Sequence, residues 1–261
     1  MTLLAVAIAG RGLVDPGGPV FRAADDALLR GGAAFETVRV YGGKPFLLED
    51  HLVRFRFSAE ALALPATDGA EELVALVVGA AVPDHVLRLY RTSRALVATA
   101  AALPAGLEEL RERGVTMKTF DVGAPTSLLA GAKTTSYDVS FAARRAAENS
   151  GADDALLVGA GYVLEAATAN VWWRRGEELY TPEVRAGVLP GVTRGFVRSV
   201  EAAREGAFEL ASLLAADEAF LTSSIREVMP VVAIDGARIG NGRPGPAAAR
   251  LQHALRLRSA P

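Results

Sequence analysis

The segment "LLAGAKTTSYDVS", residues 128–140, places a lysine in surroundings that have little use for a surface charge. Leu, Ala and Gly precede Lys133, and hydroxyl-bearing residues and Tyr137 follow it before the pattern becomes helical. The chain has only three lysines, at positions 44, 118 and 133, among 28 basic residues. An amine that attacks a carbonyl must lose its proton easily, and apolar surroundings favour the neutral amine. Lys133 is therefore a candidate for covalent chemistry, although local context alone favours a solvated ammonium, as we expect for Lys44 and Lys118.

The composition limits the classes of function. The chain has 261 residues, 51% of them apolar and 22% charged, with a net charge of −2. This charge balance gives no basic surface for a nucleic acid. The absence of cysteine excludes disulfides, thiolate zinc sites and a cysteine nucleophile. The three histidines, His51, His85 and His253, have no metal-ligand spacing, so we expect no metal site, and we expect His51 and His253 to pack or cap within helices.

The start of the chain predicts a strand. "MTLLAVAIAG" has a short apolar run without a basic region before it, and Arg11 follows at once, which is unlike a signal peptide. No stretch approaches the roughly 20 apolar residues that span a membrane. We therefore expect a cytoplasmic protein without a membrane partner.

Strand-like and helix-like segments alternate along the chain, which predicts an α/β protein. Gly42 and Gly43 mark a hairpin tip, and the composition of residues 121–132, "DVGAPTSLLAGA", is typical of a linker. We therefore expect a small N-terminal α/β domain at 1–120 and a larger C-terminal domain at 133–261. Helices are predicted at 24–32, 48–64, 68–82, 107–114, 136–151, 189–206 and 245–258. Strands are predicted at 3–10, 34–41, 44–48, 85–93, 95–104, 115–120, 154–159, 161–167, 170–182 as a hairpin, 218–224 and 228–236.

Three further segments carry groups suited to an anionic, ring-containing ligand. "GVLPGVTRGFVRSV" opens a helix at Val192 and Thr193, where free N–H groups can hold a phosphate, although many helices start this way. "GYVLEAATANVWW" places Glu165 among small residues, where a carboxylate needs a partner such as a protonated ring nitrogen or a buried arginine. Arg54 in "EDHLVRF" could reach a phosphate, but alone it is more typical of a surface ion pair.

Taken together, these segments resemble the class IV aminotransferase family, the fold type IV enzymes that depend on pyridoxal 5'-phosphate. That family includes branched-chain aminotransferases, D-amino acid aminotransferases and 4-amino-4-deoxychorismate lyases. The resemblance extends from about Asp25 to Gly242. It rests on six segments in this order: "DDALLRGGAAFETVRVYGGKPFLLEDHLVRF", "AKTTSY", "GADDALLVGAGYVLEAATANVWW", "LYTP", "GVLPGVTR" and "ADEAFLTSSIREVMPV".

The resemblance implies a role for each matching residue. Lys133 matches the lysine that binds the cofactor covalently and acts as the catalytic base. Glu165 matches the acid that pairs with the ring nitrogen, Leu189 the apolar residue on the ring face, and Tyr137, with a spacing one residue shorter than in branched-chain enzymes, the tyrosine near the ring hydroxyl. The phosphate would be held by Arg54, Val192, Thr193 and Ser224. The resemblance also implies the D-amino acid aminotransferase-like architecture, with two α/β domains, the cofactor in the cleft between them, and a homodimer.

The specificity signals are mixed. "AATANVWW" after Glu165 is similar to the lyases, and "GAAFETVRV" to the lyases and the D-amino acid enzymes. We therefore expect an aminodeoxychorismate lyase of folate biosynthesis, which releases pyruvate and leaves 4-aminobenzoate. The alternative is an aminotransferase that acts on a branched-chain or D-amino acid and a 2-oxo acid, and a binding protein without catalysis is a third reading. A carboxylate-binding arginine could be Arg88, Arg91 or Arg94, and the sequence does not decide which one faces the substrate.

Overall fold

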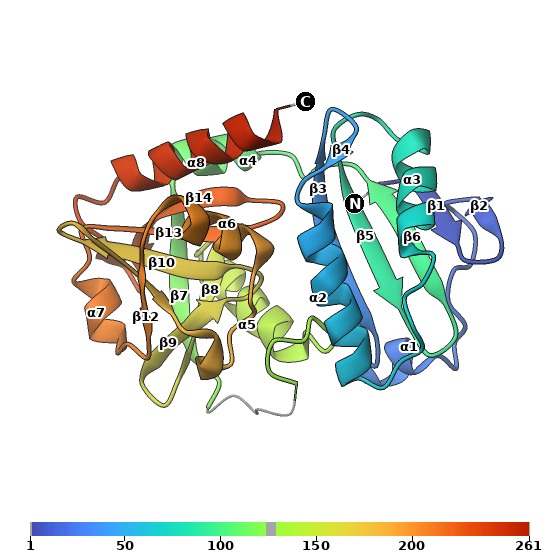
Figure 1. Ribbon diagram of the computed structural model, residues 1–261. Coiled ribbons are helices and arrows are strands. Elements are labelled where there is room, and N and C mark those ends of the chain that lie inside the picture. The colour runs from blue at the N-terminus through green and yellow to red at the C-terminus, as the bar shows by residue number, and fades with distance from the viewer. Residues whose placement is uncertain (1, 124–128, 261) are drawn as a thin grey trace. The chain divides into compact units, whose positions relative to one another are not determined.

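A computed structural model describes residues 2–123 and 129–260 of the chain (Figure 1). The chain forms two compact units. The first unit comprises Met1–Ala105, Ala132–Tyr137 and Ser259–Pro261, and the second comprises Gly106–Gly131 and Asp138–Arg258. Both are mixtures of helices and one sheet each, which confirms the predicted α/β class.

The first unit contains a six-stranded sheet with the order β2-β1-β6-β5-β3-β4, and all its pairings are antiparallel. Gly42 and Gly43 form the tip between β3 and β4, both with positive φ, as the sequence predicts. The strands are β1 (Leu3–Ile8), β2 (Gly12–Val14), β3 (Ala34–Tyr41), β4 (Lys44–Pro45), β5 (His85–Arg91) and β6 (Leu96–Ala101), and the helices of this part of the chain are α1 (Asp26–Arg30), α2 (Leu48–Ala61) and α3 (Ala70–Ala80).

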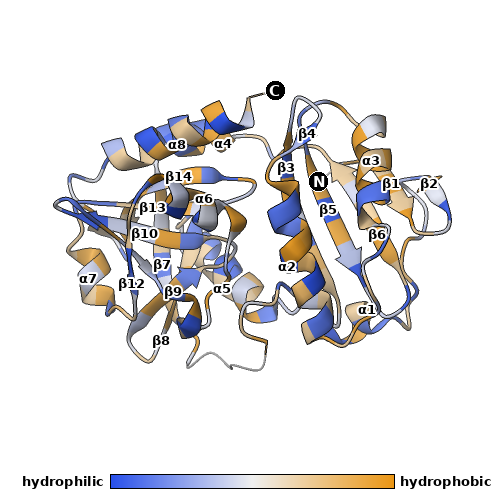
Figure 2. Cartoon of the chain, in the orientation of Figure 1, coloured by the Kyte–Doolittle hydropathy of each residue, from blue (hydrophilic) through white to orange (hydrophobic). Residues whose placement is uncertain are grey.

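Helices α2 and α3 cover one face of this sheet. Leu52, Phe55 and Ala59 of α2 lie at helical spacing and are buried in one core with alternate residues of β3 and β5. Figure 2 shows hydrophilic and hydrophobic residues alternating along α2, as expected of a helix with one buried side. Acidic residues in its first turn suit the positive end of the helix dipole. The helix ends before Pro65, as predicted.

The second unit contains a mixed sheet that has nine strands in the part of the chain that the structure describes. Its order is β12-β11-β10-β13-β14-β7-β8-β9, with β15 paired to β14. The pairs β11–β12, β14–β7 and β7–β8 are parallel, and the others are antiparallel. The strands are β7 (Val115–Asp121), β8 (Asp154–Gly159), β9 (Tyr162–Ala166), β10 (Asn170–Arg175), β11 (Glu178–Pro182), β12 (Arg204–Gly206), β13 (Glu218–Ser223), β14 (Glu227–Ile234) and β15 (Ala237–Arg238).

The core of the second unit contains residues from both early and late parts of that unit's sequence. Trp173, Leu221 and Met229 are fully buried in it with residues of β7, β8 and β9. The helices are α4 (Leu107–Arg113), α5 (Asp138–Asn149), α6 (Val192–Val200), α7 (Leu210–Leu214) and α8 (Pro246–Ser259), with a short 3-10 turn at Val184–Ala186. Figure 1 shows α8 next to α4. Among the helices of the described residues, none combines the length and apolar character that crossing a membrane requires.

The structure differs from the predicted elements at one edge of the second sheet. Residues 189–206 were expected to be helical, but α6 ends at Val200 and Arg204–Gly206 form β12. Thr181 of β11 is the register partner of Glu205, so parallel pairing satisfies backbone groups that a longer helix would have paired internally.

The compact units also differ from the predicted division at 121–132. Helix α4 and β7 lie in the second unit, because β7 pairs with both β14 and β8. Conversely, Ala132–Tyr137 belongs to the first unit. Residues 124–128 of the predicted linker lie outside the described residues.

Candidate active site

Lys133 is held against the start of β3. The Phe35 N–H donates to the Lys133 carbonyl at 3.0 Å, and the Thr135 N–H donates to the Ala33 carbonyl at 2.9 Å. Ala34 and Thr134 form an antiparallel bridge between these contacts. The segment around Lys133 therefore joins the first unit through an isolated bridge to β3, although it follows β7 in the sequence.

The amine of Lys133 lies among aromatic groups. Its Nζ is 2.9 Å from the Tyr137 hydroxyl and 4.3 Å from the centre of the Phe35 ring. Phe35 and Tyr137 meet edge to face, with their ring centres 5.5 Å apart. Lys133 is half-buried, and its amine contacts a phenol hydroxyl and an aromatic ring. The structure thus places the Tyr137 hydroxyl beside the Lys133 amine.

Arg54 lies in a buried ion pair. Its Nε and Nη2 donate to the two carboxylate oxygens of Glu36 at 2.7 and 2.8 Å, and His51 Nδ1 lies 2.7 Å from Glu36 Oε2. All three side chains are less than a tenth exposed. The sequence left two alternatives for Arg54, a phosphate ligand or a member of a surface ion pair. The structure shows a third arrangement, in which a buried carboxylate fixes the plane of the Arg54 guanidinium.

The protonation of this cluster follows from its burial. Burial raises the pKa of Glu36, but the charge and hydrogen bonds of Arg54 and the hydrogen bond of His51 outweigh burial and lower this pKa to about 2. Burial lowers the pKa of His51, as do the charges of Arg54 and Lys133, against the opposing effect of Glu36. A neutral His51 beside an ionised Glu36 must carry its proton on Nδ1 and donate it to that carboxylate. His51 thus packs within its helix, as expected, and also forms a hydrogen bond with Glu36.

Strand alternation separates the three candidate arginines. In the β3–β5 pairing, Tyr90 lies opposite Phe35 and Arg88 lies opposite Thr37, so Arg88 shares a face of the sheet with the Phe35 ring. Arg91 belongs to the other face, where its Nε donates to the Pro65 carbonyl at 2.9 Å. Arg94 follows β5 and is exposed. Arg88 is therefore the candidate whose strand position matches that of the groups around the Lys133 amine.

In the second unit, Glu165 is fixed by its neighbours. Glu165 Oε2 accepts hydrogen bonds from the Leu189 N–H and from Asn170 Nδ2, both at 3.1 Å. The same Asn170 nitrogen donates to the Leu189 carbonyl at 2.8 Å. Asn170 thus links the end of β9 to the segment before α6. The predicted ring-contacting Leu189 and the predicted ring-nitrogen partner Glu165 are brought together.

The start of α6 has the backbone geometry that can bind an anion. Gly191 is the N-cap residue and supplies no side-chain hydrogen bond to the helix. The N–H groups of the first turn, with Val192 and Thr193 at its start, are therefore available at the positive end of the dipole. A Cβ on Gly191 would lie 2.1 Å from Asn170 Oδ1, so this approach needs glycine. Ser224 follows β13 in the same unit.

The chemistry of these groups fits pyridoxal 5'-phosphate. Within the second unit, the held carboxylate suits a protonated ring nitrogen and the helix terminus suits a phosphate. Within the first unit, the amine of Lys133 is of the kind that binds an aldehyde. Among the described residues, no cluster of His, Asp and Glu suits a metal ion.

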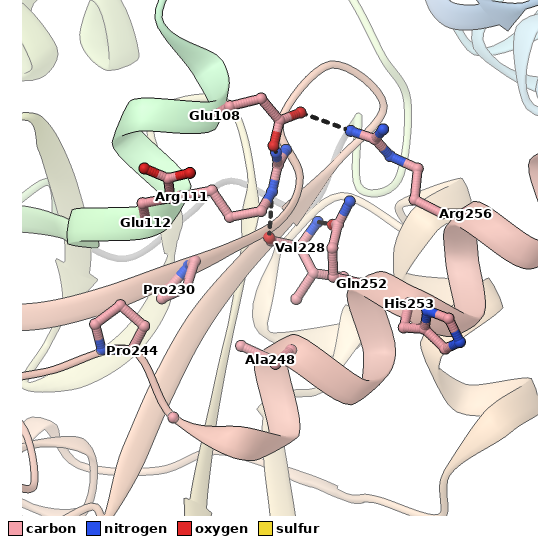
Figure 3. A pocket seen from close by; sticks show the side chains of 12 residues that line it. Glu108, Arg111, Glu112, Val228, Pro230, Pro244, Ala248, Gln252, His253 and Arg256 are labelled. Atoms are coloured by element: carbon pink, nitrogen blue, oxygen red, sulfur yellow. Dashed lines mark hydrogen bonds and ion pairs between the residues drawn. The ribbon is translucent and has the colours of Figure 1, made fainter.

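A separate pocket of about 400 Å³ lies in the second unit between α4, α8 and β14. Figure 3 shows Glu108 between Arg111 and Arg256, the two arginines that also contact the buried Glu227. None of the predicted site residues lines this pocket. Glu108, Arg111 and Arg256 in its lining are linked by ion pairs, and the two arginines connect α4 and α8 to Glu227 at the start of β14.

The fold and these groups agree with the comparisons to known proteins. The sequence profile of the class IV amino-transferase family matches residues 33–234, so the chain belongs to this family. It is a pyridoxal phosphate-dependent enzyme, a lyase or an aminotransferase.

Relatives of both kinds are similar to the chain. It is 27% identical to an aminodeoxychorismate lyase of Bacillus subtilis, covering 87% of this chain and 86% of that one. It is 30% identical to a bifunctional aminodeoxychorismate lyase and D-amino acid transaminase of Mycobacterium tuberculosis, covering 87% and 90%. The pyridoxal phosphate-bound structure of a hypothetical aminotransferase from M. tuberculosis superposes with a TM-score of 0.88 at 28% identity, covering 98% and 99%.

Sequence reasoning missed several residues of these arrangements. Glu36 alternates with Ala34, Val38 and Val40 on the buried side of β3, so a carboxylate in that row was a signal that a cation lies opposite. Asn170 gave no comparable signal, because its bonds to Glu165 across a turn and to the Leu189 carbonyl 19 residues later depend on the folded chain.

Proposed function

We propose that this enzyme is an aminodeoxychorismate lyase, which eliminates pyruvate from 4-amino-4-deoxychorismate and leaves 4-aminobenzoate. One observation carries the choice of lyase. The turn between Glu165 and Asn170 consists of Ala166, Ala167, Thr168 and Ala169, and an Ala166–Ala169 bridge closes it. The turn therefore supplies no second carboxylate beside Glu165. This agrees with the similarity of the segment "AATANVWW" to the lyases. The lyase of B. subtilis among the relatives supports the same choice.

The residues divide the chemistry between them. Bound pyridoxal phosphate supplies an electron-accepting ring that stabilises negative charge on the substrate carbon bearing the amine. Glu165 keeps a proton on the ring nitrogen, and Asn170 and the Leu189 N–H hold its carboxylate in place. The free amine of Lys133 would remove the proton from the substrate carbon that bears the amine. The bond from the neighbouring carbon to the substituent would then break, and the substituent would leave as an enolate with the bonding electrons and take up a proton to become pyruvate.

Positioning residues complete the proposed site. Arg54, the start of α6 and Ser224 hold the phosphate, and Glu36 fixes the plane of the Arg54 guanidinium. Arg88, on the Phe35 face of β5, binds a substrate carboxylate. The enzyme acts in the cytoplasm as a homodimer, as the family resemblance implies.

The alternative function is transfer of an amino group from a branched-chain or D-amino acid to a 2-oxo acid. D-alanine aminotransferase of Bacillus licheniformis is 28% identical to the chain, and the M. tuberculosis relative at 30% carries both activities in its name. Both reactions begin with proton removal by the same lysine. They differ in whether a substituent leaves or a proton returns to the cofactor.

A paired assay tests the proposal. The purified enzyme is incubated with aminodeoxychorismate and no 2-oxo acid, and separately with D- or branched-chain amino acids and 2-oxoglutarate. Release of pyruvate and 4-aminobenzoate in equal amounts in the first incubation supports the lyase, whether or not the second shows transfer. Turnover in the second incubation alone would replace the lyase with an aminotransferase.

A further inference from the structure

Ser58 connects the turn of α2 that carries Arg54 to the backbone of Lys133. The Ser58 hydroxyl donates to the Arg54 carbonyl at 2.7 Å and accepts from the Lys133 N–H at 2.9 Å. Ser58 is completely buried. Its single hydroxyl proton and one of its lone pairs are therefore used in fixed directions. The lone pair accepts from Lys133, which lies 75 positions later in the sequence.

The two backbone groups of Lys133 are anchored differently. Its carbonyl accepts from the Phe35 N–H, which is strand pairing that any residue could make. Its N–H depends on the side chain of Ser58. The flexible lysine chain then reaches the Tyr137 hydroxyl and the Phe35 ring. Because Nζ sits at the end of four rotatable bonds, its position for attack on an aldehyde depends on a backbone that does not shift.

We propose that Ser58 is a positioning residue that sets the backbone of Lys133, and through it the place of the reactive amine. This inference rests on the proposed role of Lys133. The donor contact to the Arg54 carbonyl orients the hydroxyl so that its lone pair meets the Lys133 N–H. The same α2 face carries His51 and Arg54, so one helix fixes both the lysine and the proposed phosphate-binding arginine.

The test measures covalent capture of pyridoxal, which has the aldehyde but lacks the phosphate. Its visible absorption band on binding to Lys133 reports the lysine separately from Arg54 and α6. The variants are Ser58→Ala, Ser58→Cys, which keeps nearly the same volume with a weak acceptor, and Ser58→Thr, which keeps the hydroxyl. Ser150→Ala is the control, since Ser150, an exposed residue directly after α5, also donates to a helix carbonyl, that of Ala147, but accepts from no distant N–H that the structure describes.

We expect Ser58→Ala and Ser58→Cys to slow capture by about 10- to 100-fold, the loss typical of a reacting group displaced by about 1 Å. Ser58→Thr should restore most of the rate, and Ser150→Ala should leave it unchanged. The pH midpoint of the visible absorption change should move in Ser58→Ala, because Nζ leaves the Tyr137 hydroxyl. A loss of stability alone would move the thermal midpoint and not this pH midpoint.

Two results would overturn the inference. One is capture at the wild-type rate and pH midpoint by folded Ser58→Ala or folded Ser58→Cys. The other is a rate that follows side-chain volume, with Ser58→Thr as slow as Ser58→Ala and Ser58→Cys normal. Capture is independent of the reaction that follows, so failure of the pyruvate assay would leave this inference standing. Failure of wild-type capture would instead remove the role of Lys133 itself.

Discussion

At the scale of single residues, Lys133 differs from Lys118 in the groups that surround its amine. Lys118 lies on β7, about half exposed, with its Nζ 3.3 Å from Asp235. Lys133 has an aromatic ring and a phenol beside its amine instead of a carboxylate. Lys118 therefore belongs to an ion pair, whereas the contacts of the Lys133 amine are a phenol hydroxyl and an aromatic ring.

Replacing Lys133 therefore tests this difference directly. Lys133→Ala should bind pyridoxal phosphate without the visible band that borohydride abolishes in the wild type, and its turnover should disappear. Absorption spectra and the mass of the borohydride-reduced protein provide the measurement. Lys118→Ala, the matched control, should keep both the band and the added mass. A retained band in Lys133→Ala would place the covalent bond on another amine.

Glu36 has a stabilising role because it neutralises a buried cation. Glu36→Gln leaves the Arg54 guanidinium buried without its counter-charge, which we expect to lower the free energy of unfolding by about 3 kcal/mol. Glu49→Gln removes the partner of Arg56 in an ion pair that is largely exposed. This change should alter the free energy of unfolding by less than about 1 kcal/mol. Urea unfolding of both variants gives the comparison, and equal effects would refute the buried-pair argument.

The pKa of Glu36 predicts how the free energy of unfolding depends on pH. The pKa of Glu36 is lowered to about 2 in the folded chain, against about 4.3 for an unfolded glutamate. Its contribution is therefore complete above the unfolded pKa and is lost as the pH falls from about 4.3 to about 2. The difference in unfolding free energy between wild type and Glu36→Gln should narrow over this range. Urea titrations at successive pH values measure it, and a constant difference would mean that Glu36 is not the group that titrates.

Arg88 is the arginine whose replacement should affect the substrate. Arg88→Gln should lower kcat/KM by about 10- to 100-fold, the value of a charge-assisted hydrogen bond. Arg94→Gln, at an exposed position beyond β5, should leave kcat/KM unchanged. Steady-state kinetics with the substrate of the paired assay provide the measurement. The opposite pattern would assign carboxylate binding to Arg94 and the loop after β5.

At the scale of elements, the sequence predicted what depends on neighbours along the chain. The hairpin tip at Gly42 and Gly43 and the helix that buries Leu52 and Phe55 follow from local spacing. Residues 204–206 could not be assigned correctly, because their strand exists only through pairing with β11. Likewise, the Lys133–Tyr137 contact joins residues four positions apart in the sequence, whereas the pairing of Glu36 with Arg54 required the register of α2 on β3.

The start of α6 offers a prediction at this scale. Gly191→Ala would push a Cβ to 2.1 Å from Asn170 Oδ1 and displace the amide that holds Glu165 and Leu189. We expect about 1–3 kcal/mol of destabilisation and weaker binding of pyridoxal phosphate. Gly195→Ala, in the same helix with open space around it, should be neutral or stabilising by up to about 1 kcal/mol. Thermal unfolding and cofactor titration distinguish them, and a harmless Gly191→Ala would show that the Asn170 contact does not matter.

At the scale of the whole molecule, the chain leaves and re-enters its two units several times. It enters the second unit at Gly106, returns to the first for Ala132–Tyr137, and re-enters the second at Asp138. The lysine segment therefore lies within the sequence of the second unit, while its bridge to Ala34 joins it to β3 of the first unit. A division of the gene near residue 120 would cut through this arrangement, because β7 lies between β14 and β8 in the second sheet.

Fragments test this organisation. A fragment of residues 133–261 lacks β7, so its sheet is split between β14 and β8, and we expect it to be unfolded or aggregated. A fragment of residues 106–258 keeps every strand of the second sheet and should retain a cooperative unfolding transition. Circular dichroism and thermal unfolding of the two fragments measure the contrast. Because the longer fragment differs from the shorter mainly by α4, β7 and the segment to Ala132, equal folding of both would show that β7 is dispensable.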